Sequence, residues 1–205
     1  FEFEFSRDSF SDLAATQIRV FGVSDPSGAS ELNYPGRPGS WIFAPPTSNR
    51  ERPSPYQWNS TIRFGYQGNA RWYRDDGWSD PERGFTWSLG KRASLVMRLP
   101  EPKGVVSLNA TLNPFLHPGA LDTQAVVILV NGRRVGRWTI SRSGYRPQSM
   151  DIPPDFFTDL TRTIITFETP DSAAPVELGV SGDRRVLGVA LSSLQLAESA
   201  KCSLP

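Results

Sequence analysis

Aromatic rings and charged groups stand close together in residues 69–87, where the sequence reads NARWYRDDGWSDPERGFTW. The rings are those of Trp72, Tyr73, Trp78, Phe85 and Trp87. Rings among hydrogen-bonding groups suit a ligand that is polar but ring-shaped, such as a sugar, because its C–H face stacks on a ring while its hydroxyls find donors and acceptors. This stretch is therefore the first place to expect a binding surface.

The five rings divide by their position relative to the next strand. Phe85 and Trp87 stand two residues apart just before an alternating segment, and this spacing predicts core residues. The other three rings lie in a loop rich in Gly, Asp and Ser, and loops carry function disproportionately. We therefore predict a ligand-binding site in this loop, with a merely solvent-facing loop as the alternative. Its members are Trp72, Tyr73, Arg74, Asp75, Asp76 and Trp78.

Four carboxylates of the same stretch could supply oxygen ligands to Ca²⁺. They belong to Asp75, Asp76, Asp80 and Glu82. Their spacing departs from the D-x-[DN]-x-[DN]-G calcium loop. Three arginines of the stretch, Arg71, Arg74 and Arg83, are available as partners. We therefore expect no cofactor and a solvated, ion-paired acidic loop, with a calcium site as the alternative.

The sequence shows no recognisable catalytic constellation. Its one histidine, His117, precedes Pro118 and Gly119 in a turn, and the chain has neither a G-x-S-x-G elbow leading into a helix nor a nucleotide-binding glycine loop. Two carboxylates on different strands could still form a glycosidase pair, because only their separation in space identifies one. A non-catalytic protein is expected, and a glycan-processing enzyme that uses a carboxylate pair stays open.

Length and charge narrow the classes of partner. The 205 residues include 22 Lys and Arg and 21 Asp and Glu, which gives a net charge of +1. A charge this small produces no electrostatic field that would attract nucleic acid or an anionic membrane surface. No run approaches the ~20 apolar residues of a membrane-spanning helix. A lone Cys202 excludes an internal disulfide framework and a cysteine-based zinc site.

Short alternating or β-branched segments recur along the chain with turn signals between them. The clearest is QAVVILV at 124–130, which Asn131-Gly132 links to RRVGRWTI in the pattern of a type I′ hairpin. Residues 92–99 alternate like a half-buried strand. Further strands are expected at 1–5, 17–23, 58–66, 105–112, 163–168 and 185–196, with a helical turn at 9–15 and an irregular Pro/Gly-rich segment at about 24–56.

About nine or ten strands predict an all-β fold, an antiparallel two-sheet β-sandwich of the jelly-roll, carbohydrate-binding-module-like kind. One domain is expected over residues 1–205. The predicted core residues are Leu95, Met97, Val126, Ile128, Val130, Ile164, Phe167, Val189 and Leu191.

Three blocks of the chain together resemble a known family. They are GWSDPERGFTWSLGKRASLVMRLP at 77–100, QAVVILVNGRRVGRW at 124–138 and PVELGVSGDRRVLGVALSSLQL at 175–196. In this order they are similar to an uncharacterised β-sandwich accessory domain found with bacterial cell-envelope polysaccharide and phosphoglycerol-type transferases. The resemblance implies an accessory, carbohydrate-related role outside the cytoplasm, in the periplasm or cell envelope, and supplies no catalytic residues. Residues 1–68 fall outside it.

The leading hypothesis is a non-catalytic carbohydrate-binding or accessory domain of a bacterial cell-envelope glycan system. Its partner would be a glycan or a membrane-associated protein, and not nucleic acid. A structural subunit that docks on a larger membrane assembly is an alternative, because tryptophans are favoured interface anchors and Trp41, Trp58 and the Pro-rich segment could form such an interface.

Overall fold

The computed structural model describes residues 53–198, and nine strands and two short 3₁₀ helices lie in that range. The strands are β1 (Thr61–Arg63), β2 (Thr86–Leu89), β3 (Arg92–Met97), β4 (Val106–Pro114), β5 (Gln124–Val130), β6 (Arg133–Ile140), β7 (Arg146–Ile152), β8 (Thr163–Glu168) and β9 (Leu187–Glu198). The 3₁₀ helices are η2 (Ala70–Trp72) and η3 (Pro154–Phe156). The elements predicted at 1–5, 9–15 and 17–23 and most of the irregular segment lie outside the described residues. The single domain over 1–205 stays a prediction.

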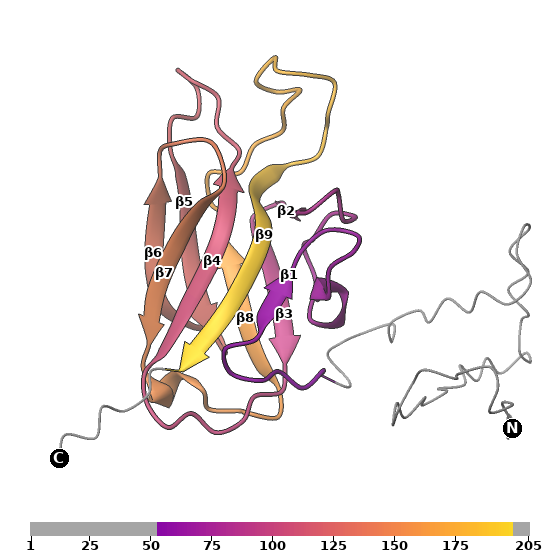
Figure 1. Cartoon of the computed structure of the whole chain (residues 1–205). Coiled ribbons are helices and arrows are strands. Elements are labelled where there is room, and N and C mark those ends of the chain that lie inside the picture. Colours follow the sequence, from indigo (N-terminus) through magenta and orange to yellow (C-terminus); the bar gives the residue numbers. More distant parts are fainter. Residues whose placement is uncertain (1–52, 199–205) are drawn as a thin grey trace, which may run out of the picture. The chain divides into compact units, whose positions relative to one another are not determined.

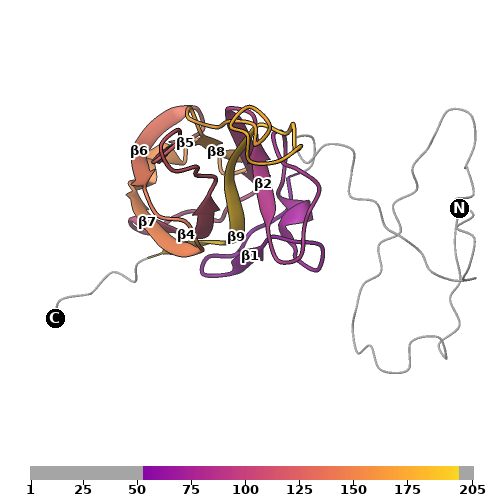
Figure 2. The ribbon, with the colours of Figure 1, turned by 90° about the horizontal axis from the view of Figure 1, so that it is seen from above.

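Two antiparallel sheets pack face to face, which confirms the predicted β-sandwich (Figures 1 and 2). One sheet has the order β1-β9-β4-β7, with β2 as a further partner of β9, and the other has the order β3-β8-β5-β6. At one flank β6 lies beside β7, where the Trp138 indole N–H donates to the Ser149 carbonyl at 3.0 Å. Of the helices in residues 53–198, none has the length and hydropathy to cross a membrane.

The core between the sheets is built from alternating strand residues. In β4 every second residue from Val106 to Pro114 is buried, and the residues that alternate with them are partly exposed on the outer face. Eight of the nine predicted core residues are fully buried. The exception is Ile164, which is only partly buried because its neighbour Ile165 takes the inward position.

Residues 73–78 form an edge cover over β3. The Val96 N–H donates to the Tyr73 carbonyl at 2.8 Å, and the Asp75 N–H donates to the Ser94 carbonyl at 2.9 Å. The cover then reaches β2, where the Leu89 N–H donates to the Gly77 carbonyl at 2.7 Å. It therefore closes the flank between the two sheets. The half-buried strand predicted at 92–99 is confirmed at Arg92 and Arg98, which are exposed, whereas Ser94 and Val96 on the same face are buried.

The hairpin between β5 and β6 turns at Asn131-Gly132, as predicted. Both residues have positive φ, 49° and 79°, which is the requirement of a type I′ turn. The Asn131 side chain also fixes the turn to its surroundings, because its Oδ1 accepts a hydrogen bond from the Ile164 N–H at 2.9 Å. The turn thus sets the register of β5 with β6 and touches β8.

We predict that Gly132→Val lowers the free energy of unfolding by about 1 to 3 kcal/mol, because a β-branched residue is strained at positive φ. Chemical denaturation monitored by tryptophan fluorescence measures it. Gly182→Val is the control, since Gly182 has ordinary φ and a Cβ there would meet nothing within 4 Å. Equal midpoints for the two variants would show that the turn strain is absent.

The edge cover gives a second stability prediction. A Cβ on Gly77 would lie 1.9 Å from the Arg92 carbonyl oxygen, and its φ is +82°. Gly77→Ala must therefore push the cover away from β3, and we expect a loss above about 3 kcal/mol, more than φ strain alone supplies. Gly179→Ala has similar φ strain (+69°) in open space and separates the two causes. Similar losses in both variants would contradict the close packing of the cover.

Candidate functional site

Two of the predicted ligand-binding rings pack against the core instead of standing free in the loop. The Trp78 ring lies 5.2 Å from the Phe64 ring and 6.1 Å from the Phe167 ring between centroids, and its N–H donates to the Ser94 carbonyl at 2.6 Å. Tyr73 packs against Tyr56 at 6.0 Å. Both rings are partly buried and contribute to the edge of the core.

The other members of the predicted site also have contacts within the fold. Trp72 is partly buried in η2 with the Arg71 guanidinium 5.0 Å from its ring centroid. The Arg74 guanidinium donates to the Ser79 carbonyl at 2.8 Å, and burial lowers the pKa of Arg74 while Asp80 acts in the opposite direction. Asp75 accepts a hydrogen bond from the Ser94 hydroxyl at 3.3 Å, and the Asp76 carbonyl accepts one from the Ser94 N–H. A ligand-binding role for this loop stays a prediction.

The four carboxylates proposed as an alternative calcium site do not converge. Asp75 faces Ser94, whereas Glu82 pairs with Arg185 at 3.3 Å. Within residues 53–198 no three His, Cys, Asp or Glu side chains are grouped as metal ligands would be. The described residues thus give the calcium alternative no grouped ligand set, and no cofactor is established.

Phe85 and Trp87 were predicted as core residues, and this was wrong. In β2 the inward positions belong to Thr86 and Ser88, which are fully buried, and Ser88 Oγ accepts a hydrogen bond from the Val189 N–H at 2.9 Å. Trp87 pairs with Ala190 on the outer face of the same sheet. Phe85 and Trp87 are only partly buried and stand outside the core.

Four rings form an outer aromatic row on this face, defined as Phe115, Trp87, Phe85 and Tyr145. Neighbouring centroids along the row are 6.4, 6.0 and 5.9 Å apart. Tyr145 is the most accessible of the row at 43% exposure. None of the four belongs to the core between the sheets.

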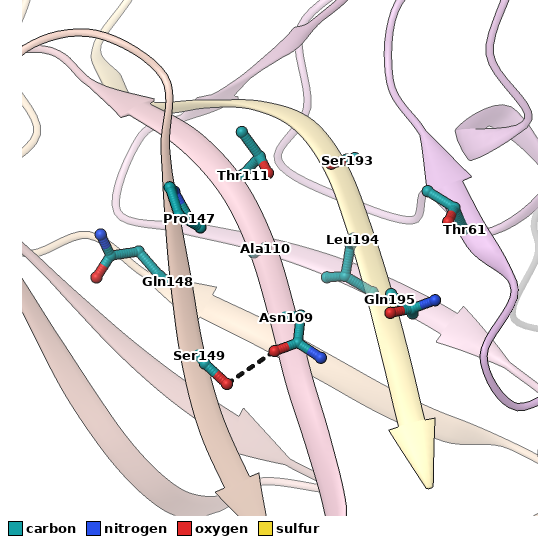
Figure 3. Close-up of a pocket in the computed structure, with 10 residues that line it drawn as sticks. All are labelled: Thr61, Asn109, Ala110, Thr111, Pro147, Gln148, Ser149, Ser193, Leu194 and Gln195. Atoms are coloured by element: carbon teal, nitrogen blue, oxygen red, sulfur yellow. Dashed lines mark hydrogen bonds between the residues drawn. The ribbon is translucent and has the colours of Figure 1, made fainter.

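A polar hollow, the outer groove, lies further along the same face (Figure 3). It has a volume of about 460 Å³ and crosses β1, β9, β4 and β7. The residues that line it are Thr61, Asn109, Ala110, Thr111, Pro147, Gln148, Ser149, Ser193, Leu194 and Gln195. Since all ten are uncharged, the groove offers amides and hydroxyls without a fixed charge.

Hydrogen bonds within the groove fix some of its amides and leave hydroxyls available. Asn109 accepts from the Ser149 hydroxyl at 2.8 Å, and Gln195 donates to the Asn59 carbonyl at 2.6 Å. The hydroxyls of Thr111 and Ser193 form no hydrogen bond with another residue of the described range. Amides and hydroxyls donate and accept at once, which suits a ligand with many hydroxyl groups.

The outer groove and the outer aromatic row share one face because they share β4. Its outward positions are Ser107, Asn109, Thr111 and Asn113, and Phe115 follows in the same alternation. Thr111 pairs with Ser193 and Pro147, and Asn113 pairs with Ala190. The signal in the sequence is SLNATLNPF, with a polar residue at every second position and an aromatic one at the end, a pattern that by itself predicts only a strand.

Charged side chains stand at the rim of the aromatic row. Arg185 holds Asp183 at 2.7 Å and reaches Glu82 at 3.3 Å, and its hydrogen bonds hold the pKa of Asp183 below its usual value. Burial, helped by the nearby Glu82 carboxylate, raises the pKa of Tyr145 to about 12. The Tyr145 phenol is neutral at physiological pH.

Of the two tryptophans predicted as anchors for protein docking, Trp58 lies in the part of the chain that the structure describes. Trp58 packs edge-on against Tyr56 at 6.3 Å and against Phe157 at 6.1 Å, so it is part of the core margin. Trp41 lies outside the described residues.

His117, the one histidine of the sequence, lies in a turn that is closed by backbone hydrogen bonds between His117 and Leu121.

Solved structures with a similar chain path include carbohydrate-binding modules and larger carbohydrate-active enzymes such as a ruminal GH26 endo-beta-1,4-mannanase. A family 6 carbohydrate-binding module is 12% identical with a TM-score of 0.42, covering 69% of this chain and 95% of its own. A second one, from Clostridium stercorarium in complex with cellobiose, is 13% identical with a TM-score of 0.40 over the same shares. A family 36 module in complex with calcium and xylotriose is 10% identical with a TM-score of 0.34, covering 72% of this chain and 96% of its own. Likeness at this level says nothing about ligand or activity.

No family model matches the sequence, and no curated protein matches it either.

The pKa of Tyr145 tests whether its phenol is partly buried and close to the Glu82 carboxylate, as the structure has it. Because its pKa is raised above 10, the neutral phenol stabilises the fold fully below pH 10, and this contribution is lost as the pH rises through about 12. The difference in phenolate absorbance between wild type and Tyr145→Phe should therefore show one group titrating near pH 12. Glu82→Gln should move that titration to lower pH, still above 10. A Tyr145 phenol that ionises near pH 10 would show that neither partial burial nor Glu82 acts on it.

Proposed function

We propose that this chain is a non-catalytic glycan-binding domain and that the outer face of the five-stranded sheet is its binding surface. One observation carries the proposal: an uncharged groove of amides and hydroxyls lies on the same sheet face as four aromatic rings that take no part in the core. Sugars need both chemistries, because rings receive their apolar faces and amides or hydroxyls bind their hydroxyl groups. This surface differs from the loop at 71–82 that the sequence singled out.

The absence of a catalytic role is part of the proposal. Hydrolysis of a glycosidic bond needs two carboxyl groups across the bond. None of the ten residues that line the outer groove is an acid. The charged pair nearest the aromatic row, Glu82 and Arg185, is tied into a salt bridge.

The cellular context rests on the resemblance of three sequence blocks to accessory domains of cell-envelope transferases. We therefore propose a bacterial cell-envelope glycan as the ligand and a location outside the cytoplasm. A membrane-associated protein is the alternative partner, and it would dock without competition from free glycan.

Retention in affinity gels tests the function. Native electrophoresis through gels that contain mixed-linkage β-glucan, xylan, glucomannan, dextran or purified bacterial envelope polysaccharide should slow the wild-type domain in at least one polymer. The double variant Thr111→Val/Ser193→Ala should bind about tenfold or more weakly, because it removes two hydroxyls at about 0.5 to 1.5 kcal/mol each. Its thermal melt should match wild type, since neither hydroxyl bonds to another described residue.

Thr139→Val is the matched control, because this substitution also replaces a hydroxyl with a methyl group, at an exposed position of the opposite sheet. It should leave retention unchanged. A wild-type domain that no polymer retards, or a Thr111→Val/Ser193→Ala variant retarded like wild type, would reject the groove as a glycan site. Gels with the Trp72→Ala variant test the loop at 71–82 in parallel.

A further inference from the structure

Resting on the proposed function, we infer that the outer groove and the outer aromatic row are two halves of one site, which takes an extended, uncharged oligosaccharide along β4 and stacks one sugar unit on Tyr145. The groove half binds hydroxyls of the preceding units.

Continuity along β4 is the first support. Between the groove residue Thr111 and the ring of Phe115 the only outward side chain of β4 is Asn113. Asn113 Oδ1 accepts a hydrogen bond from the Gly144 N–H at 2.7 Å, so it fixes the turn that carries Tyr145. Its neighbour on β9 is Ala190, whose side chain is too small to divide the face.

The length of the surface sets the length of the ligand. Asn109 pairs with Ser149, and Tyr145 is four positions before Ser149, which at about 3.4 Å per residue corresponds to about 14 Å. A ligand that touches both ends must therefore be a chain of several sugar units. A monosaccharide or disaccharide can occupy only part of the face.

Tyr145 is the ring best placed to stack on a sugar. Its exposure of 43% exceeds that of the other three rings, which are partly buried against one another. Phe85 lies 5.9 Å from it at 47°, and Trp87 in turn lies 6.0 Å from Phe85 at 86°. Phe85 thus packs against Tyr145 and restricts its side chain, so that little side-chain freedom is lost when a ligand binds.

The charges in and around the site bear on the charge of the ligand. The groove lining carries no ionisable group. At its rims stand Arg63, which pairs with Ser193, and Asp151, which accepts a hydrogen bond from Ser107 at 2.6 Å. Charges of both signs therefore stand around the site, with the exposed Arg146 between Tyr145 and Pro147 among them, and it is the uncharged lining of the groove that favours an uncharged chain.

Calorimetric titration with oligosaccharides of rising length tests the inference. The probes are the disaccharide, tetrasaccharide and hexasaccharide cut from whichever polymer retards the wild-type domain in the gels. Affinity should rise at least tenfold from disaccharide to hexasaccharide, with one hexasaccharide bound per chain. Tyr145→Ala should weaken hexasaccharide binding about tenfold or more, whereas Tyr145→Phe, which keeps the ring, should bind within about twofold of wild type.

Val105→Ala is the control for truncation of an exposed side chain. Val105 is 42% exposed and lies just before the first residue of β4, at the end of the strand away from Tyr145. It should leave the affinity unchanged. Two hexasaccharides per chain, equal affinity at all lengths, or wild-type affinity in Tyr145→Ala would overturn the inference while leaving the groove as a glycan site. A domain that no polymer retards fails at the earlier step, so the two failures are distinguishable.

Discussion

The backbone ladder of β9 is the constraint on which the rest of the structure depends. β9 pairs with β4 along one edge, and with β1 and then β2 along the other. Since paired residues share a face, this register places Ser193 and Gln195 outward beside Thr111 and Asn109. A slip by one residue would turn the groove into the core and the core into solvent. The candidate site is thus a consequence of strand register rather than of a separate loop.

Closure of the flank explains why so many aromatic residues lie in one stretch of sequence. The edge cover at 73–78 bonds to β3 and β2, and Trp78 fills the space between Phe64 and Phe167. Its rings therefore serve the junction of two sheets. By contrast, Phe85 and Trp87, only a few residues later, pass to the outer face. Rings that are close in the sequence thus have different roles. Trp78 packs against the core, whereas Phe85 and Trp87 lie on the outer face because Thr86 and Ser88 take the inward positions of β2.

The predictable parts of the fold are those in which local pattern and tertiary context agree. The apolar, β-branched run of β5 and the Asn131-Gly132 turn are each determined by local residue types, and both were predicted. Three errors arose where the choice of inward face, which the local pattern does not show, was different from the predicted one. Val96 is buried on the outward side of β3, Ile165 rather than Ile164 takes the inward position in β8, and Thr86 with Ser88 fills the inward side of β2. The aromatic row joins residues from three separate segments, which no linear spacing can show.

Amide chemical-shift mapping tests the central claim most directly, because it shows where a glycan binds without any change to the protein. A ¹⁵N-labelled domain is titrated with the hexasaccharide of the retained polymer. The account predicts shifts at Asn109, Thr111, Ser193 and Tyr145 and at the Trp87 indole, with the Trp72 and Trp78 indoles unmoved. Shifts confined to the loop at 71–82, or to the outer face of the β3-β8-β5-β6 sheet, would contradict it.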